Sequence, residues 1–576
     1  MNDLNLSSVL IKKALTYAVT LLPFVAACSS RTQQSEVVLK DTPSNAITME
    51  EVTGNEVTKA KKIRKKKSIS KKEKNSANTA AGPKKVRGVV SPKAKQQCLD
   101  LVAKVVIPYR ELFSKLNLAT YTKDPNSAVE QMLQITPEAC DKPDTYRSAV
   151  ALINAGTNDH SGRLGIMLPL TGKNNQLTTY IAKGMRAAFA ESGQNFETST
   201  LLKDTSASGN PERVLAELVF KDRVTAVVGG FENLDAQVLA KWSERLMLPV
   251  VITNHDRNAG AASRYAYMLY PDEMRLAYTL AAEAQRRGIK RVAILKPVNN
   301  KSDSLVNYFK QALLAQGGQV SFDLIYTSGN FDSMQAVSRT MFKVDAAERV
   351  DEYRSAYRKA KKQAEAQNAP FDPRMVVLKP IVNFDAVFLP DDFRTARHFA
   401  KLFKFHQVDK LTMMGNHEWR SPALVEPYDS FLEGSFFADF IGSYSALPAA
   451  ISAQTLGSPF FVQPSSVLAV DFQLIGYRAG KVGNMITSDK STKRRTLIQN
   501  IDHLTSNNSS FFGTGLVFEK SRRSNWPTYV FGIANGGLAL EKEHTNLNIP
   551  SAAPKIIETS TIKSSATLVL QPKQKT

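Results

Sequence analysis

Cysteine is scarce in this chain, with three residues in 576: Cys28, Cys98 and Cys140. Histidine is also rare, with seven residues, and no His/Cys group has the spacing of a metal site. The sequence contains no G-x-S-x-G motif and no P-loop, the signatures of many hydrolases and nucleotide-binding proteins. Asn416-His417-Glu418 places a His beside a Glu, which alone is more typical of a polar loop than of a catalytic pair. We therefore expect no enzyme, no cofactor and no metal.

The positive charge is concentrated in one segment. Of the net charge of +22, the stretch from Lys59 to Lys95 contributes +14, from 15 Lys/Arg and a single Glu. The rest of the chain carries +8, which is ordinary for a folded protein and unlike a uniformly basic nucleic-acid binder. We expect no nucleic-acid partner, and the length is sufficient for two or more domains.

Residues 1–28 predict an export signal. Lys12 and Lys13 precede an apolar stretch, Ala14 to Ala27, that is too short to span a membrane. The end of this stretch, Val25-Ala26-Ala27-Cys28, resembles the lipobox of bacterial lipoproteins. The resemblance implies that Cys28 is lipidated, and Ser29 after it favours the outer membrane, facing the periplasm. An ordinary signal with a nearby Cys, or an uncleaved anchor, is the alternative.

Export affects how the remaining cysteines are interpreted. In an oxidising compartment, Cys98 and Cys140 predict a disulfide that closes a loop of about forty residues. Two buried free thiols are the alternative.

Residues 29–95 predict a disordered, Lys-rich linker, because they lack usable hydrophobic periodicity. Such a chain has a root-mean-square span of roughly 45 Å and a limit of about 200 Å. Its basic run fits an acidic partner in the envelope, either anionic lipid or the carboxylates of peptidoglycan. A merely solvating linker is the alternative.

From residue 96 onward the chain predicts folded structure. Residues 96–160 have helical periodicity, and an α/β pattern follows over 161–540. The segment Arg163 to Gly172, R-L-G-I-M-L-P-L-T-G, is an apolar run ended by breakers, typical of a buried parallel strand. Strands and helices then alternate in two successive series along the chain, which predicts two doubly wound lobes with a cleft between them. Lobe 1 comprises about 161–269 and 441–505, and lobe 2 about 270–440 and 506–540; residues 541–576 predict a flexible tail.

The order of these segments carries a family resemblance. R-L-G-I-M-L-P-L-T-G, V-T-A-V-V-G-G and L-P-V-V-I-T-N are similar to the first lobe of type I periplasmic binding proteins, the leucine-binding and receptor-ligand-binding superfamily. D-A-V-F-L-P-D-D and M-M-G-N-H-E-W are similar to the second lobe. In a lipoprotein, this domain also resembles the outer-membrane activators of penicillin-binding proteins. The helical segment 96–160 is much shorter than the N-terminal domain of the best-known activators.

A highly charged insertion, Val344 to Asn368, interrupts the second lobe and is a strong helix former. An exposed helix with ion pairs is the simple interpretation, and a partner-binding arm is the alternative.

The candidate ligand cleft is formed by residues at the carboxyl ends of strands. These residues are Thr171, Lys173, Asp204, Thr205, Phe231, Glu232, Asn254, His255, Asp391, Asn416 and Glu418. The resemblance places a ligand carboxylate after the third strand, where Glu232 would repel it, and an ammonium close to Glu418. A free amino acid is therefore disfavoured as the ligand.

We expect a lipid-anchored, non-enzymatic regulator of peptidoglycan synthesis, similar to penicillin-binding protein activators. Its partners would be the membrane, a peptidoglycan synthase and peptidoglycan, with a small-molecule ligand in the cleft left open. The second interpretation is a lipid-anchored receptor of an ABC-type transporter for an amino acid or another small polar solute.

Overall fold

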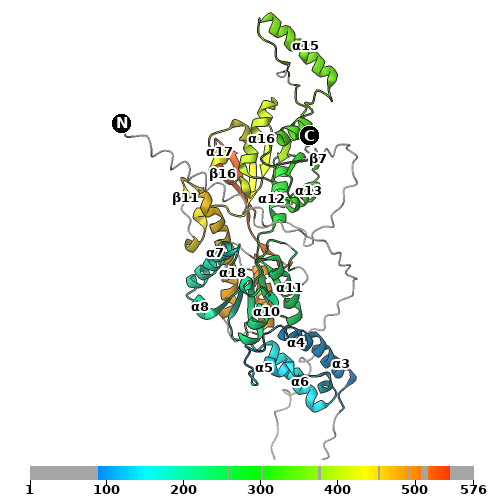
Figure 1. Cartoon of the computed structure of the whole chain (residues 1–576), viewed down its shortest axis with the longest axis vertical. Coiled ribbons are helices and arrows are strands. Elements are labelled where there is room, and N and C mark those ends of the chain that lie inside the picture. The colour runs from blue at the N-terminus through cyan, green and yellow to red at the C-terminus, as the bar shows by residue number, and fades with distance from the viewer. Residues whose placement is uncertain are drawn as a thin grey trace, which may run out of the picture. The chain divides into compact units, whose positions relative to one another are not determined.

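The computed structural model describes residues 89–544, except 257, 261–262, 300–301, 374–375, 377, 452–454, 489–492, 508–516 and 520. The predicted export signal, Cys28, residues 29–88 of the linker and residues 545–576 lie outside the described residues. The described part belongs to one compact unit, Val89–Thr576. It is an α/β structure with two mainly parallel sheets, so the predicted fold class is confirmed (Figure 1).

The first described elements form a helical collar, defined here as residues 91–158. It contains α3 (Pro92–Leu101), the π-helix η2 (Val102–Val106), α4 (Ile107–Phe113), α5 (Ala128–Leu133), the 3₁₀-helix η3 (Pro137–Cys140) and α6 (Pro143–Thr157). α3 begins before the predicted boundary at residue 96, because Ser91 caps it and Pro92 occupies its first turn. Cys98 in α3 and Cys140 in η3 form a disulfide, 42 residues apart in sequence.

The collar packs tightly on lobe 1. Its buried side chains share one hydrophobic cluster with lobe 1 residues such as Phe220 and Trp242. Arg494 fastens the two parts: its buried guanidinium donates to the Tyr109 hydroxyl at 3.0 Å and to the carbonyls of Thr157 and Val224 at 2.9 and 2.8 Å. The collar is therefore a fixed extension of lobe 1.

Lobe 1 is built on a parallel sheet in the order β2-β1-β3-β4-β5. The strands are β1 (Leu164–Leu168), β2 (Thr200–Asp204), β3 (Ala226–Gly229), β4 (Val250–Ile252) and β5 (Ala266–Met268). The helices are α7 (Asn175–Glu191), α8 (Phe196–Ser199), α9 (Thr205–Ser208), α10 (Pro211–Ala216) with the π-helix η4 (Glu217–Lys221), α11 (Asn233–Leu246), α18 (Pro464–Ser488) and α19 (Arg494–Asn507). α7 and α18 touch through glycines: a Cβ on Gly184 would overlap the carbonyl oxygen of Gln473.

Lobe 2 repeats this strand order and extends it. Its sheet runs β7-β6-β8-β9-β10 in parallel, then adds the antiparallel β15 and β16. The strands are β6 (Arg291–Pro297), β7 (Gln319–Tyr326), β8 (Ala386–Phe388), β9 (Thr412–Gly415), β10 (Phe436–Asp439), β15 (Thr528–Ala534) and β16 (Gly537–His544). The helices are α12 (Glu273–Arg286), α13 (Asp303–Ala315), α14 (Phe331–Phe342), α15 (Val350–Ala366), α16 (Phe393–Phe405) and α17 (Pro422–Val425), with the short 3₁₀ turns η6 (His417–Trp419) and η7 (Ser430–Leu432).

The connecting segments and the last strands shift two of the predicted boundaries. They contain η8 (Tyr444–Ala446), η9 (Ala449–Ile451) and the short hairpins β11 (Thr455–Leu456)–β12 (Ser458–Val462) and β13 (Val517–Phe518)–β14 (Ser524–Asn525). Phe518 and Trp526 lie in the hydrophobic cluster of lobe 1. The last segment of lobe 2 therefore begins at β15, later than the predicted residue 506, and β16 continues past residue 540.

Candidate functional site

β1 and β3 are neighbours in the lobe 1 sheet, but the chain continues from β1 to β2 on one side and from β3 to β4 on the other. The topological switch point therefore lies between the carboxyl ends of β1 and β3. In open parallel sheets this switch point is where ligands bind. Here the loops that follow the two strands are joined directly, since the Asn174 side-chain amide donates to Glu232 Oε1 at 2.8 Å. The carboxylate that was predicted to repel an acidic ligand is thus held by a neighbouring loop.

Asp204 binds the chain around it instead of facing an open site. It accepts hydrogen bonds from the Thr171 hydroxyl at 2.8 Å, from the Leu170 amide at 3.0 Å and from the Ser206 amide at 2.9 Å. Burial works to raise the pKa of Asp204, but these hydrogen bonds outweigh it and leave the pKa below its ordinary value. Thr171 and Asp204, both predicted site residues, therefore satisfy each other.

Thr205 and Asn254 are also engaged within lobe 1. The Thr205 hydroxyl donates to Asp235 Oδ2 at 2.7 Å, and burial raises the pKa of Asp235 to about 6. The Asn254 amide donates to the Phe231 carbonyl at 2.9 Å, and its Oδ1 accepts from the Asp256 amide. Lys173 and His255 are exposed, and the Phe231 ring contacts Phe472 of α18 edge-on at 5.8 Å.

The predicted residues of lobe 2 lie at the ends of β8 and β9. Asp391 accepts hydrogen bonds from the hydroxyls of Tyr326 and Ser328, each at 2.6 Å, and both of these residues belong to lobe 2. Asn416 is buried, and its Oδ1 has no hydrogen-bond partner among the described residues. Glu418 lies in η6. The predicted set is therefore divided between two separate groups of loops, one in each lobe.

A charged cluster between the lobes was not predicted. Arg420 Nε lies 2.7 Å from Asp439 Oδ2, and the Arg420 guanidinium lies over the Tyr444 ring at 5.1 Å. Asp471 of α18 interacts with this pair. Burial and the nearby Asp439 charge together raise the pKa of Asp471 to about 7, against the opposing effect of Arg420. Asp471 is the one charged residue in the apolar run 467–475, and this isolated charge is the sequence feature that could have indicated the cluster.

The crossing segments between the lobes meet at Trp526. Its indole N–H donates to the Leu269 carbonyl at 2.8 Å, and its own carbonyl accepts from Arg275 Nε at 2.7 Å. The buried guanidinium of Arg478 stacks on the ring at 3.4 Å from its centroid, and burial lowers the pKa of Arg478 to about 9. These contacts join α18 of lobe 1 and α12 of lobe 2 to the crossing segments that contain Leu269 and Trp526.

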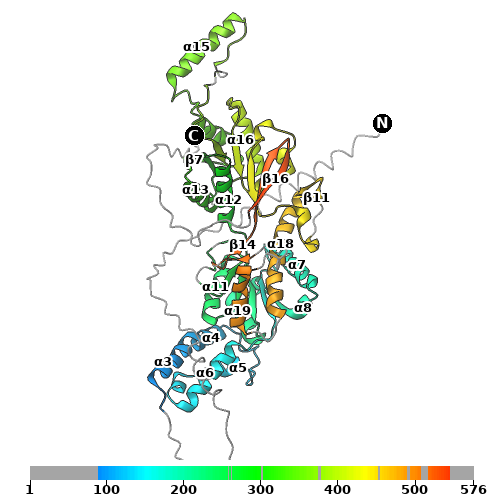
Figure 2. The ribbon, with the colours of Figure 1, turned by 180° about the vertical axis from the view of Figure 1, so that it is seen from behind.

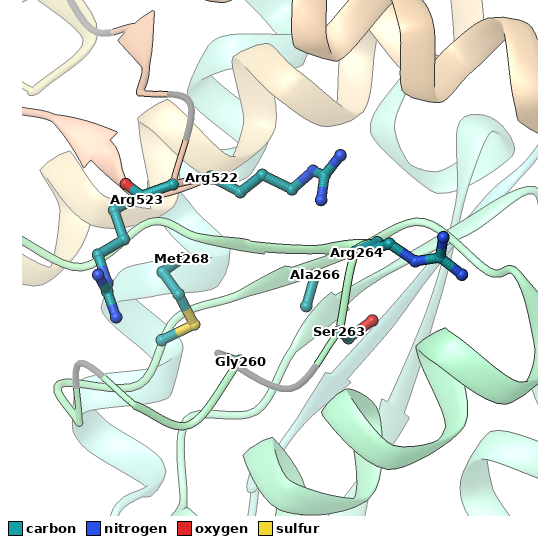
Figure 3. Close-up of a pocket in the computed structure, with 8 residues that line it drawn as sticks. Gly260, Ser263, Arg264, Ala266, Met268, Arg522 and Arg523 are labelled. Carbon is teal, nitrogen blue, oxygen red and sulfur yellow. The ribbon is translucent and has the colours of Figure 1, made fainter. Parts of the chain in front are cut away.

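Two cavities of the described chain are lined by none of the predicted site residues. One, of about 160 Å³, lies beside β5 and is lined by arginines among other residues (Figure 3). Two of these arginines are already paired, Arg264 with Glu244 and Arg522 with Asp502. The other, of about 420 Å³, is a shallow apolar groove between α7 and residues 448–450.

The described ranges contain neither a metal-binding cluster nor a membrane-spanning helix. No group of three or more His, Cys, Asp or Glu side chains in this part could hold a metal ion. No helix in the same part of the chain has the length and apolarity needed to cross a bilayer.

Comparisons with known proteins show a similarity in fold. No family model matches the chain, and no curated protein matches it in sequence. It is similar in structure to a leucine binding protein from Thermotoga maritima, with 16% identity over 66% of this chain and 98% of that one, and a TM-score of 0.42. A solute binding protein of an ABC transporter from Rhodopseudomonas palustris, in complex with 3,4-dihydroxybenzoic acid, gives 17% identity over 67% and 98%, and a TM-score of 0.40. An ABC transporter substrate-binding protein from Sphaerobacter thermophilus gives 14% identity over 68% and 99%, and a TM-score of 0.44.

These neighbours are periplasmic binding proteins of the kind that the sequence resemblance named. They are described as solute-binding proteins, the class of the second interpretation, and none of the three is described as a regulator of cell-wall synthesis. At these identities and TM-scores the likeness assigns no ligand to this chain.

Proposed function

We propose that this chain is a non-enzymatic regulator of peptidoglycan synthesis in the cell envelope, similar to penicillin-binding protein activators and anchored through Cys28. The observation that carries the proposal is the hydrogen bond between Asn174 and Glu232 at the switch point of lobe 1. The polar groups that a solute receptor would present there are bound to one another, which supports a role in binding a protein partner.

Electrostatics adds support. Three carboxylates lie at the carboxyl edge of the lobe 1 sheet: Asp204 ends β2, Glu232 immediately precedes α11, and Asp235 lies in the first turn of α11. A ligand carboxylate brought to this edge would meet several negative charges at reduced solvation, which costs several kcal/mol, on the order of a thousandfold in affinity. The long basic linker supports a protein that must reach a partner some distance from its anchor.

A receptor for a small solute is the second candidate, and one feature favours it. α11 begins at the switch point, and no side chain in the described residues caps its N-terminus. Its first-turn N–H groups are those that could receive an anionic group. The neighbours' descriptions as solute-binding proteins support the same candidate at the level of fold.

A thermal-shift assay on the full chain separates the two candidates. A solute at a hundred times its dissociation constant should stabilise the protein by about 2.7 kcal/mol, a shift of a few degrees. We expect no shift with leucine, other amino acids or hydroxybenzoates. The same protein should stimulate a purified penicillin-binding protein and co-purify with it. A clear shift with a free solute, together with no effect on any synthase, would establish the receptor instead.

The linker offers a second test. Deleting residues 59–88 leaves the described fold intact, because α3 begins only at Pro92 and Lys95 pairs with Asp141 at 2.6 Å. We expect this deletion to abolish function in cells while the protein keeps its thermal transition. A shortened protein that still functions would contradict the proposal that the linker lets the domain reach a distant partner.

A further inference from the structure

Helix α15 is the most exposed element of the described chain. Its 17 residues, Val350–Ala366, include no buried side chain. Figure 1 and Figure 2 both show it standing off from the sheet and helices of lobe 2. A helix that buries so little contributes little to the core of lobe 2.

One face of α15 is nevertheless occupied. Tyr353 and Ala356 pack on the hydrophobic cluster of lobe 2, and the Tyr357 ring meets Phe371 edge-on at 5.0 Å. Arg349, just before the helix, donates to the carbonyls of Lys343 and Lys379 at 2.9 and 2.8 Å and fixes the base. The arm therefore has a defined orientation, and its apolar face is already covered.

The opposite face carries cations at nearly every turn. Arg354, Arg358, Lys361 and Lys362 share this face. Two carboxylates also lie on it, Asp351 before these cations and Glu365 after them. The two ion pairs here are exposed and long, Arg354 with Asp351 at 3.5 Å and Lys361 with Glu365 at 4.0 Å. Arg358 and Lys362 have no ion pair within the described residues. Four cations thus lie along about 12 Å of helix.

We propose that this basic face of α15 is a docking surface for peptidoglycan, which it binds through the carboxylates of the peptide stems. The proposal rests on the function proposed above, which places the protein in the cell envelope. Cations repeated turn after turn match a polymer with repeated carboxylates better than a single small anion, and arginine binds carboxylates in a bidentate manner. A lipid surface fits less well, because a helix that binds at a bilayer buries its apolar face there, and that face is covered.

The test compares two sets of four substitutions in the full chain. The arm variant carries Arg354→Gln, Arg358→Gln, Lys361→Gln and Lys362→Gln, which removes the charges with little loss of helix propensity. The control variant carries Lys93→Gln, Lys104→Gln, Lys123→Gln and Arg147→Gln, which are exposed collar residues without ion pairs in the described part. Each protein is co-sedimented with purified peptidoglycan sacculi and, separately, with phosphatidylglycerol vesicles.

We expect the arm variant to bind sacculi about tenfold more weakly at about 0.1 M salt, because this is the combined contribution expected from four exposed ion pairs. The difference should disappear near 1 M salt, where charges are screened within about 3 Å. Equal losses in the two variants, no loss in the arm variant, a loss confined to the vesicles, or no sedimentation of the wild type would each overturn the proposal. Stimulation of the synthase is measured on the same variants, so a failure of the arm is distinguishable from a failure of the proposed function.

Discussion

Replacing Asp471 with asparagine tests the charged cluster between the lobes. Asp471 lies on α18 of lobe 1, whereas Arg420 and Asp439 belong to lobe 2 and already form a close pair. Burial and the Asp439 charge raise the pKa of Asp471 to about 7 from 3.8. The ionised form is therefore disfavoured in the folded protein, and an asparagine of the same shape would remove this cost.

The pH dependence follows from the direction of the change. Between about 3.8 and 7 the folded protein keeps a proton that the unfolded chain releases, so stability falls as pH rises through this window. The full change in pKa corresponds to about 4 kcal/mol. Because Asp471 keeps part of its surface exposed, we expect about 1–3 kcal/mol at pH 8.

Urea denaturation of wild type and Asp471→Asn at pH 4 and pH 8 measures the effect. We expect the variant to be more stable at pH 8 and indistinguishable at pH 4, where aspartic acid is mostly protonated in the folded state. Asp439→Asn is the matched control: it leaves the buried Arg420 without its partner and should destabilise at both pH values, by about 3–5 kcal/mol. An equal gain for Asp471→Asn at both pH values, or a loss at pH 8, would refute the reasoning.

Three further predictions concern stability and attachment. Replacing Cys98 and Cys140 by serine should lower the free energy of unfolding by about 3–4 kcal/mol, and reductant should reproduce the loss in a thermal melt of the wild type but not of the variant. Arg494→Met should destabilise by about 3 kcal/mol and make the collar the first site of limited proteolysis, because several buried carbonyls lose their donor; an unchanged cleavage pattern would contradict this. Gly184→Ala should lower the free energy of unfolding by more than about 2 kcal/mol in urea denaturation, because the new Cβ would overlap the backbone of α18. Gly193→Asn is the control and should have little effect, because Gly193 is exposed and asparagine accepts its positive φ.

Sequence patterns predicted the sheets because most strands are buried on both faces. The run Leu164–Leu168 is fully buried in the structure, as its near-continuous hydrophobicity indicated. The strand β5, Ala266–Met268, was not predicted. The placement of β13 and β14 with lobe 1 depends on Phe518 and Trp526 reaching a distant cluster, which spacing along the chain does not reveal.

The candidate site shows a different limit. The positions of the polar residues at strand ends followed from the alternation of strands and helices, but their hydrogen-bond partners did not. Asp204 binds Thr171 from a loop 33 residues away, and Glu232 binds Asn174 from 58 residues away. Sequence alone therefore identified these side chains as site candidates but did not reveal that they bind one another in the fold.

The attachment of the collar has a mechanical consequence. The described chain begins at Val89 and continues directly into α3, which the disulfide joins to η3. Arg494 connects Tyr109 and Thr157 of the collar to Val224, just before β3. Any tension on the preceding segment is thus taken up at the amino-terminal edge of the lobe 1 sheet. The contacts of Trp526 between the lobes lie outside this load path, so tension applied at Val89 would not be transmitted through the junction between the lobes.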